Sequence, residues 1–156
     1  DLMNIYDRIT AAGLALPSLT VAPAPFKPFK LHGNTLIVSG QLPVRNGVPV
    51  WVGKVPSDVS TDDARSAARL CVMNLLGWAH VATDGRLDRI ESVLRVGGFV
   101  ATSEGFADAP FIVNAASELL TQLFGEAGAH ARIAIGVASL PFNAPVEVEA
   151  TFALAS

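Results

Sequence analysis

The chain has 156 residues, of which 51% are hydrophobic and only 16% are charged, and its formal net charge is −3. A domain of this length buries roughly 70% of the surface that its unfolded chain exposes, so the sequence predicts one domain with a full core. The acidic balance and the scattered basic residues argue against nucleic-acid binding, because such binding depends on clustered Lys and Arg that neutralise phosphates.

The N-terminal region predicts a short helix followed by an extended segment. Apolar residues recur at helical spacing from Met3 to Ala12, and Gly13 stands where the helix should stop. The stretch from Leu16 to Lys30 then contains four prolines. Each proline removes a backbone donor and disfavours helix, so we expect this stretch to run extended over the surface.

A β-hairpin is predicted after the proline-rich stretch. Gly33 and Asn34 supply a turn, and the segment Thr35–Gln41 has the β-branched residues of a strand. We expect this strand to pair with a second one at 49–53 through Asn46-Gly47, because Asn-Gly favours the tight turn of a two-residue hairpin.

Two long helices are predicted on either side of a long strand. Ser60 is a candidate N-cap, and an apolar stripe at three- and four-residue steps continues to about residue 81. A strand follows at 90–101, in which Gly97-Gly98 indicates a bulge or a close backbone approach. The second helix is expected from about Pro110 to about residue 125.

Two final strands are predicted at 131–141 and from Val146 onward. In the last strand apolar residues alternate with Glu147 and Glu149, so one sheet face should be core and the other should carry the acids. The order is a short helix followed by ββαβαββ, which predicts an α+β fold: a single-layer sheet with both main helices on one face. We expect a subunit interface to cover the other face, because symmetric oligomers bury apolar surface that a monomer would expose.

Arg132 and Glu147 are the candidate site, since they are charges in an apolar background on these final strands. An arginine holds a carboxylate through parallel hydrogen bonds, and a nearby glutamate can move protons through water. The alternatives are an ion pair of Arg132 with Glu149 or Asp108, and an ordinary solvated role for Glu147 with Glu149 as the important acid.

The sequence also bears on membrane insertion, cellular compartment and metal binding. No segment has the roughly 18 uninterrupted apolar residues of a membrane span, and the first residues lack a secretion-signal pattern. A single cysteine, Cys71, favours a reducing compartment, and we expect the cytoplasm. His32, His80 and His130 are too far apart in sequence to predict a metal site.

The sequence resembles the Rid family of reactive-intermediate deaminases, also called YjgF-like or "endoribonuclease L-PSP". The segments that carry the resemblance are Ser39-Gly40-Gln41-Leu42-Pro43, Asn114 within Val113-Asn114-Ala115, Ala131-Arg132 ahead of Gly136-Val137-Ala138-Ser139-Leu140-Pro141, and Val146-Glu147-Val148-Glu149-Ala150. The match runs from about Gly33 to the C-terminus. The segment Leu94–Val100 and the extra N-terminal helix resemble a longer bacterial subgroup.

The resemblance implies a chorismate-mutase-like fold of the Bacillus type. It implies one domain over 1–156, with 1–32 as an extension and 33–156 as the family core. It also implies a homotrimer whose sheets form a central barrel, with three clefts between subunits. Each cleft would take a small carboxylate ligand, and nucleic acid and membrane are not expected as partners.

The implied reaction is hydrolysis of 2-imino or 2-enamino acids to 2-keto acids and ammonia, with no metal or organic cofactor. Arg132 would grip the substrate carboxylate and Glu147 would position the water. Gly40 would line the cleft, Asn114 would lie near the site, and backbone groups around Ala134 would help to hold the water. Without the resemblance, Gly40 could mark a close backbone approach only, and Asn114 could bond to a loop.

The sequence departs from the family pattern beside the arginine and at the cleft mouth. Ile133 and Ala134 replace the usual Ser or Thr and the frequent Cys, and a tyrosine at the mouth is replaced by Phe26 or Phe29. Lost hydroxyls remove hydrogen bonds, so altered substrate choice or weak deaminase activity is expected. The alternative is a non-catalytic trimer that binds small carboxylates or a partner protein. RNA cleavage, which the older family name suggests, is disfavoured by the acidic balance.

Overall fold

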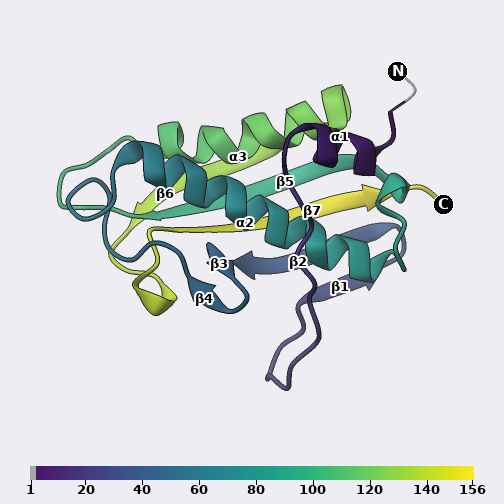
Figure 1. The fold of residues 1–156 in the computed structure, drawn as a ribbon, viewed down its shortest axis with the longest axis horizontal. Helices are drawn as coiled ribbons and strands as arrows, with labels where there is room; N and C mark the ends of the chain where they lie inside the picture. The colour runs from purple at the N-terminus through teal and green to yellow at the C-terminus, as the bar shows by residue number, and fades with distance from the viewer. Residues whose placement is uncertain (1–2) are drawn as a thin grey trace.

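The computed structural model describes residues 3–156, which form one layer of β-sheet with helices packed against it (Figure 1). The elements in chain order are α1 (Ile5–Ala11), β1 (Phe29–His32), β2 (Thr35–Gln41), β3 (Val44–Arg45), β4 (Val48–Pro49), α2 (Thr61–Ala82), η1 (Leu87–Arg89), β5 (Ile90–Ala101), α3 (Ala109–Phe124), η2 (Gly125–Gly128), β6 (Ala131–Val137), η3 (Pro141–Asn143) and β7 (Val146–Leu154).

The main sheet has five strands in the order β1-β2-β7-β5-β6. Neighbouring strands are antiparallel except β5 and β6, which are parallel and are connected through α3. Figure 1 shows α2 and α3 lying side by side across the same face of the sheet. The predicted α+β fold with both main helices on one face is therefore confirmed, and β1 and β6 are the two sheet edges.

The core lies between this sheet face and the two helices. In β7 the residues Val146, Val148, Ala150, Phe152 and Leu154 are buried and alternate with half-buried residues, as the sequence predicts. Phe152 is completely buried. Replacing such a side chain by alanine costs about 3–5 kcal/mol, because the lost contacts leave a cavity. The half-buried residues of β7, which include Glu147 and Glu149, therefore face away from the helices.

The predicted start of α2 is confirmed by its cap. The Ser60 side chain accepts a hydrogen bond from the Asp63 amide at 3.1 Å, which satisfies one of the amides left free at a helix start. Among residues 3–156, no helix combines the length and hydrophobicity that crossing a membrane requires.

The predicted hairpin between Thr35–Gln41 and 49–53 is wrong. β2 pairs with β1 on one side and with β7 on the other. The Asn46-Gly47 turn does exist, but it joins β3 and β4, which have two residues each and form a separate small sheet. Pro49 has no amide N–H with which to extend the pairing of β3 and β4. The Gly33-Asn34 turn instead joins β1 to β2, and all four residues of β1 pair with β2.

The proline-rich stretch ends earlier than predicted, because Phe29 and Lys30 belong to β1. At Gly97-Gly98 the β5 ladder is continuous with both neighbours, so the bulge is wrong there and the close approach is confirmed. A Cβ atom on Gly98 would overlap the side chain of Val113 in α3. The absence of a side chain at Gly98 therefore lets α3 lie close to the sheet.

Candidate functional site

Arg132 lies on the edge strand β6 and points to the side covered by α3. Its Nη1 donates to Asn114 Oδ1 at 2.8 Å and to Ser117 Oγ at 3.2 Å. Nothing within residues 3–156 forms an ion pair with it, and Glu149 is instead paired with Arg95 at 2.8 Å. Both hydrogens of Nη1 are used by α3, so the N–H groups of Nε and Nη2 remain for a ligand. Such an edge of a guanidinium matches the two oxygens of a carboxylate.

A second layer of hydrogen bonds orients Ser117. His130 Nδ1 lies 2.6 Å from the carbonyl oxygen of Gly128, which can only accept, so Nδ1 carries the proton. In neutral His130 the Nε2 atom is then an acceptor, and it lies 2.9 Å from Ser117 Oγ. The Ser117 hydroxyl therefore donates to His130 and keeps a lone pair for Arg132. The chain of bonds runs in one direction from the guanidinium to the backbone.

Ser117 was missed by the sequence reasoning, and His130 was considered there only as a possible metal ligand. A signal for Ser117 was present, because residues three apart on a helix share a face and Ser117 is three residues after Asn114.

Glu147 and Gly40 lie against each other on the β2 side of β7. A Cβ atom on Gly40 would overlap Oε2 of Glu147, so only glycine leaves room for this carboxyl group. Glu147 is half-buried. Burial, and secondarily the negative charge of Glu149, raise the pKa of Glu147 above its ordinary value of 4.5. A carboxyl group with a raised pKa is better matched to exchanging protons with water near neutrality.

Phe26 and Phe29 occupy different environments beside this pair. Phe26 is 66% exposed and, together with Gly40 and Trp78, lines a cavity of about 260 Å³. Phe29 is half-buried and packs on Trp78, with ring centroids 6.3 Å apart. Phe26 is therefore the one that faces the cavity, and Phe29 supports its wall.

Arg132 and Glu147 do not meet within one chain. In the β5 ladder, Arg132 pairs with the buried Val96, so its side chain is on the helix side. Glu147 alternates with the buried residues of β7, so its side chain is on the uncovered side. The two residues also lie on strands separated by β5. One chain thus holds two separate groups of candidate residues. They are called here the arginine half-site, made of Arg132, Asn114 and Ser117, and the glutamate half-site, made of Glu147, Gly40 and, through the cavity beside Gly40, Phe26.

Ala134 is on the same side of β6 as Arg132 and packs partly against the core. Ile133 points to the opposite, uncovered face, where it is 39% exposed. The arginine half-site therefore has a methyl group beside it where family deaminases often have a thiol.

Other reactive groups do not add to either half-site. Cys71 is completely buried, and burial raises the pKa of its thiol well above the usual value, so it is an unreactive thiol. Within residues 3–156, no three His, Cys, Asp or Glu side chains gather in a way that could hold a metal ion.

The family model described as "YjgF/chorismate mutase-like, putative endoribonuclease" matches residues 6–153. The chain belongs to this family. The match covers both half-sites and all but the ends of the chain, so the predicted relationship to the Rid or YjgF-like family is confirmed.

Several solved structures share the fold. A protein of unknown function from Agrobacterium tumefaciens is 39% identical, with a TM-score of 0.90, and the match covers 97% of this chain and 92% of that one. A "putative endoribonuclease" from Shewanella oneidensis is 30% identical, with a TM-score of 0.91, over 97% of this chain and 100% of that one. The YjgF gene product of Escherichia coli is 26% identical, with a TM-score of 0.57, and the match covers 88% of this chain and 92% of that one.

A curated relative, Protein TCP17 of Trypanosoma cruzi, is 35% identical over 148 residues, or 94% of this chain and 92% of its own. The similarity therefore includes the N-terminal region of this YjgF-family chain as well as the core strands.

Proposed function

We propose that this YjgF-family protein hydrolyses small 2-imino or 2-enamino acids to 2-keto acids and ammonia, at sites built between subunits of a homotrimer. The observation that carries the proposal is the arginine half-site. Arg132 has no acid partner within residues 3–156, is held by two bonds from α3, and keeps its Nε and Nη2 donors for a carboxylate. Its partner in the reaction is the half-buried Glu147 beside Gly40.

A head-to-tail assembly would join the two half-sites. The arginine half-site is at the β6 edge of the sheet, and the Phe26 and Gly40 cavity is near β1 and β2 at the other edge. Contacts between different patches of identical subunits close into a ring when the rotation permits, and three subunits give three equivalent sites. Apolar side chains on the uncovered face support an interface there, since Ile37, Ile133 and Ile135 are 49%, 39% and 41% exposed.

The proposed mechanism uses only groups of the chain and water. Arg132 binds the substrate carboxylate through Nε and Nη2, which places the adjacent imine carbon in the cleft. The Glu147 carboxylate takes a proton from water as the water oxygen attacks that carbon, and passes this proton to the imine nitrogen, which gives a carbinolamine. Glu147 then takes the proton of the carbinolamine hydroxyl and delivers it to the nitrogen as the carbon–nitrogen bond breaks, so that ammonia and the 2-keto acid leave. The overall change is imine plus water to ketone plus ammonia.

Ile133 and Ala134 bear on the choice of substrate. Ala134, on the same side of β6 as Arg132, offers no side-chain donor or acceptor, so the surroundings of Arg132 are more apolar than with a thiol there, and Ile133 adds an apolar side chain on the uncovered face. We expect imines with apolar side chains, such as 2-iminobutyrate, to be preferred over polar ones. A buried free cysteine supports the cytoplasm as the proposed location.

The activity can be measured with 2-iminopropionate made in situ by an amino-acid oxidase, with semicarbazide trapping the imine that escapes hydrolysis. Wild type should release keto acid faster than the uncatalysed reaction, and Arg132→Ala should not. Arg86→Ala is the matched control, because Arg86 is an exposed arginine paired with Asp88 away from both half-sites. Equal activity of wild type and Arg132→Ala would exclude Arg132 from the mechanism.

Mixing two inactive variants tests whether each site is shared between subunits. If Arg132→Ala and Glu147→Gln chains are unfolded, mixed and refolded together, roughly a quarter of the interfaces would carry both intact half-sites, given random assembly of a ring. Recovery of about that fraction of activity supports the shared site. No recovery, with trimers present by analytical ultracentrifugation, would contradict it.

The lack of polar side chains at Ile133 and Ala134 favours a second candidate function, a non-catalytic trimer that binds small carboxylates or a partner protein. A ligand that binds only the folded state raises thermal stability by mass action. Stabilisation of wild type by 2-keto acids, lost in Arg132→Ala and unaccompanied by imine hydrolysis, would favour this binding function.

A further inference from the structure

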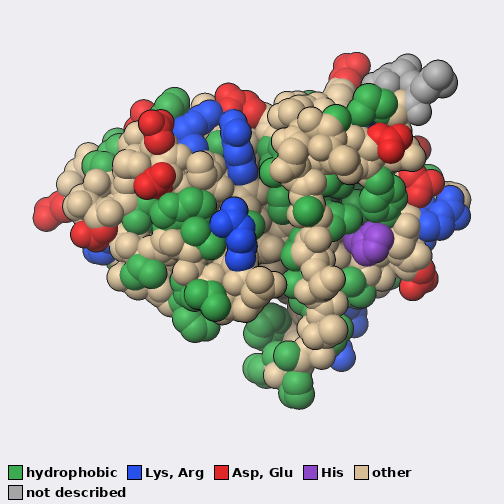
Figure 2. Space-filling view, in the orientation of Figure 1, with side chains coloured by type: hydrophobic (Ala, Val, Ile, Leu, Met, Phe, Trp, Pro, Cys, Tyr) green, Lys and Arg blue, Asp and Glu red, His purple; other side chains and the backbone are tan. Residues whose placement is uncertain are grey.

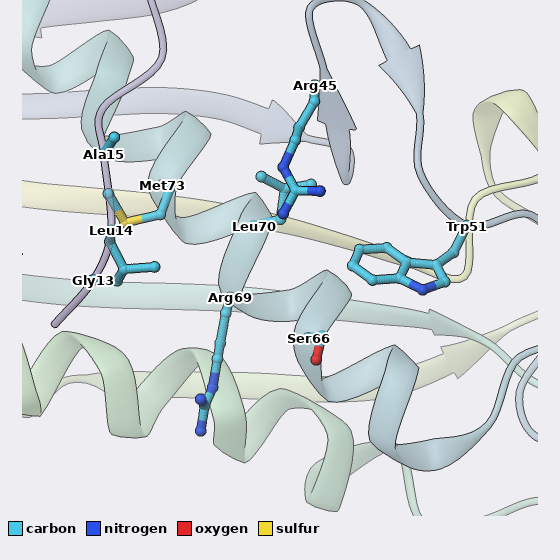
Figure 3. Close-up of a pocket in the computed structure, with 9 residues that line it drawn as sticks. All are labelled: Gly13, Leu14, Ala15, Arg45, Trp51, Ser66, Arg69, Leu70 and Met73. Carbon is cyan, nitrogen blue, oxygen red and sulfur yellow. The ribbon is translucent and has the colours of Figure 1, made fainter.

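A cavity of about 400 Å³ lies on the helix side of the molecule, between the N-terminal segment at Gly13–Ala15, the β3–β4 hairpin and α2 (Figure 3). It shares no lining residue with the Phe26 and Gly40 cavity, and it includes no residue of β6. The cavity is therefore separate from both half-sites of the proposed deaminase.

Two arginines without partners line this cavity. Every other arginine of the chain donates a hydrogen bond to a carboxylate, a side-chain oxygen or a backbone carbonyl. Arg45 and Arg69 are the exceptions, because neither side chain has an ion pair or hydrogen bond within residues 3–156, and both border the same cavity. No lining residue is acidic. The positive charge is thus left for an anion from outside.

The rest of the cavity is apolar and contains one aromatic ring. Leu70 and Met73 of α2 form its floor, and the half-buried Trp51 stands on the far side from the N-terminal segment. Figure 3 shows the Arg45 guanidinium lying above Leu70, within the space between the N-terminal segment and Trp51. Figure 3 shows Arg69 extending from α2 away from Arg45, so this exposed lining residue forms the rim of the cavity. Figure 2 shows the same face, with basic side chains set among hydrophobic ones.

We propose that this cavity binds a small amphiphilic anion, an aromatic ring that carries one carboxylate. The ring would pack between Trp51 and the Leu70 floor, and Arg45 would bind the carboxylate as a planar fork. Arg69, at the rim, adds attraction across solvent and so contributes less than Arg45. This site goes beyond the proposed deaminase, since it uses none of the residues assigned to that reaction.

The test uses 2-naphthoate as the probe and 2-naphthamide, which has a similar shape without the charge, as its control. Trp51 and Trp78 are the two tryptophans of the chain, so in a Trp78→Phe background the fluorescence reports on Trp51 alone. We expect saturable quenching by 2-naphthoate and binding of 2-naphthamide about tenfold or more weaker, because charge-assisted hydrogen bonds to arginine are lost.

Variants then locate the binding site. Arg45→Ala should weaken 2-naphthoate binding about tenfold, and Arg69→Ala about threefold, because the rim charge is screened by solvent. Arg86→Ala changes the net charge equally outside the cavity and should leave the affinity unchanged. Both cavity arginines are exposed, so circular dichroism should report intact folds.

Three outcomes would overturn the proposal. They are no saturable quenching at millimolar 2-naphthoate, equal affinity for the charged and neutral probes, or affinity that falls in Arg132→Ala and persists in Arg45→Ala. The last outcome would place the probe at the deaminase half-site instead. Imine hydrolysis measured on the same variants keeps the two sites distinguishable, since Arg45→Ala should retain whatever activity the wild type has.

Discussion

The Nη1 atom of Arg132 donates to Oδ1 of Asn114 at 2.8 Å, which ties the edge strand β6 to the helix α3. An exposed arginine normally samples many rotamers, and holding it costs side-chain entropy at the moment of binding. The bond to Asn114 holds the guanidinium before a ligand arrives, with its Nε and Nη2 side directed away from α3. This preorganisation is the basis of the first two predictions.

Asn114→Ala should weaken carboxylate binding at the arginine half-site. Hydrogen bonds to charged groups contribute about 1.5–3 kcal/mol, so we expect KM for the imine to rise about tenfold, with a smaller change in kcat. Asn114→Gln is the conservative control, because its side-chain carbonyl oxygen can accept the same kind of bond without adding a negative charge beside Arg132, and it should partly restore KM. Steady-state kinetics of both variants provide the measurement, and an unchanged KM in Asn114→Ala would remove this positioning role.

The bonds around Ser117 predict the tautomer of His130. Because Nδ1 faces the carbonyl of Gly128, nitrogen NMR of the neutral imidazole should show the proton on Nδ1 and an unprotonated Nε2. Ser117→Ala should shift the Nε2 resonance and raise KM about threefold, since the bond lost is the longer of the two, at 3.2 Å, and Asn114 still holds Nη1. A proton found on Nε2 would refute the direction of the hydrogen-bond chain, whether or not the protein is an imine hydrolase.

Gly40→Ala should displace the Glu147 carboxyl group. The added Cβ would overlap Oε2 of Glu147, so the acid has to leave its position beside β2. We expect imine hydrolysis to fall about tenfold or more, the range in which lost general acid–base groups act. Gly105→Ala is a suitable control, because Gly105 has a positive φ but open space around its Cβ position. It should lose some thermal stability and keep its activity, and equal activity loss in both variants would count against the Gly40 argument.

The raised pKa of Glu147 predicts how stability depends on pH. The folded state binds the Glu147 proton more tightly than the unfolded state, so the stabilisation from this group is complete below pH 4.5 and is lost as pH rises through the folded-state pKa. Glu147→Gln should therefore be more stable than wild type at neutral pH, and the difference should shrink as the pH falls toward 4.5. Urea unfolding of both proteins between pH 4.5 and neutrality measures the difference in the free energy of unfolding. A difference that grows as the pH falls would contradict the prediction.

The elements with strong local signals could be predicted from the sequence. The Ser60 cap and the apolar stripe of α2 lie within one segment, and the alternation in β7 repeats over nine residues. The pairing of β2 could not be predicted in this way, because both Gly33-Asn34 and Asn46-Gly47 are good turn sequences. The choice depends on β7, which lies more than a hundred residues further along the chain and covers the other side of β2.

The candidate site was also predictable only in part, because some of its contacts depend on tertiary structure. The resemblance to the family picked out Arg132, Glu147 and Gly40, and the structure places the last two in contact. The contact of Arg132 with Ser117 arises only because β6 runs parallel to β5 and passes beside α3, which is a tertiary arrangement. That Phe26 rather than Phe29 faces the cavity also depends on tertiary structure, since β1 begins at Phe29 and turns its ring toward Trp78.

Under the proposed shared site, the placement of the arginine and the glutamate on opposite faces of the sheet would leave a lone chain inert. Turnover per chain would then depend on dilution: it would fall at concentrations where the proposed ring dissociates and recover on concentrating the sample, by mass action. Anything that competes for the β6 edge would act as an inhibitor without entering the cleft.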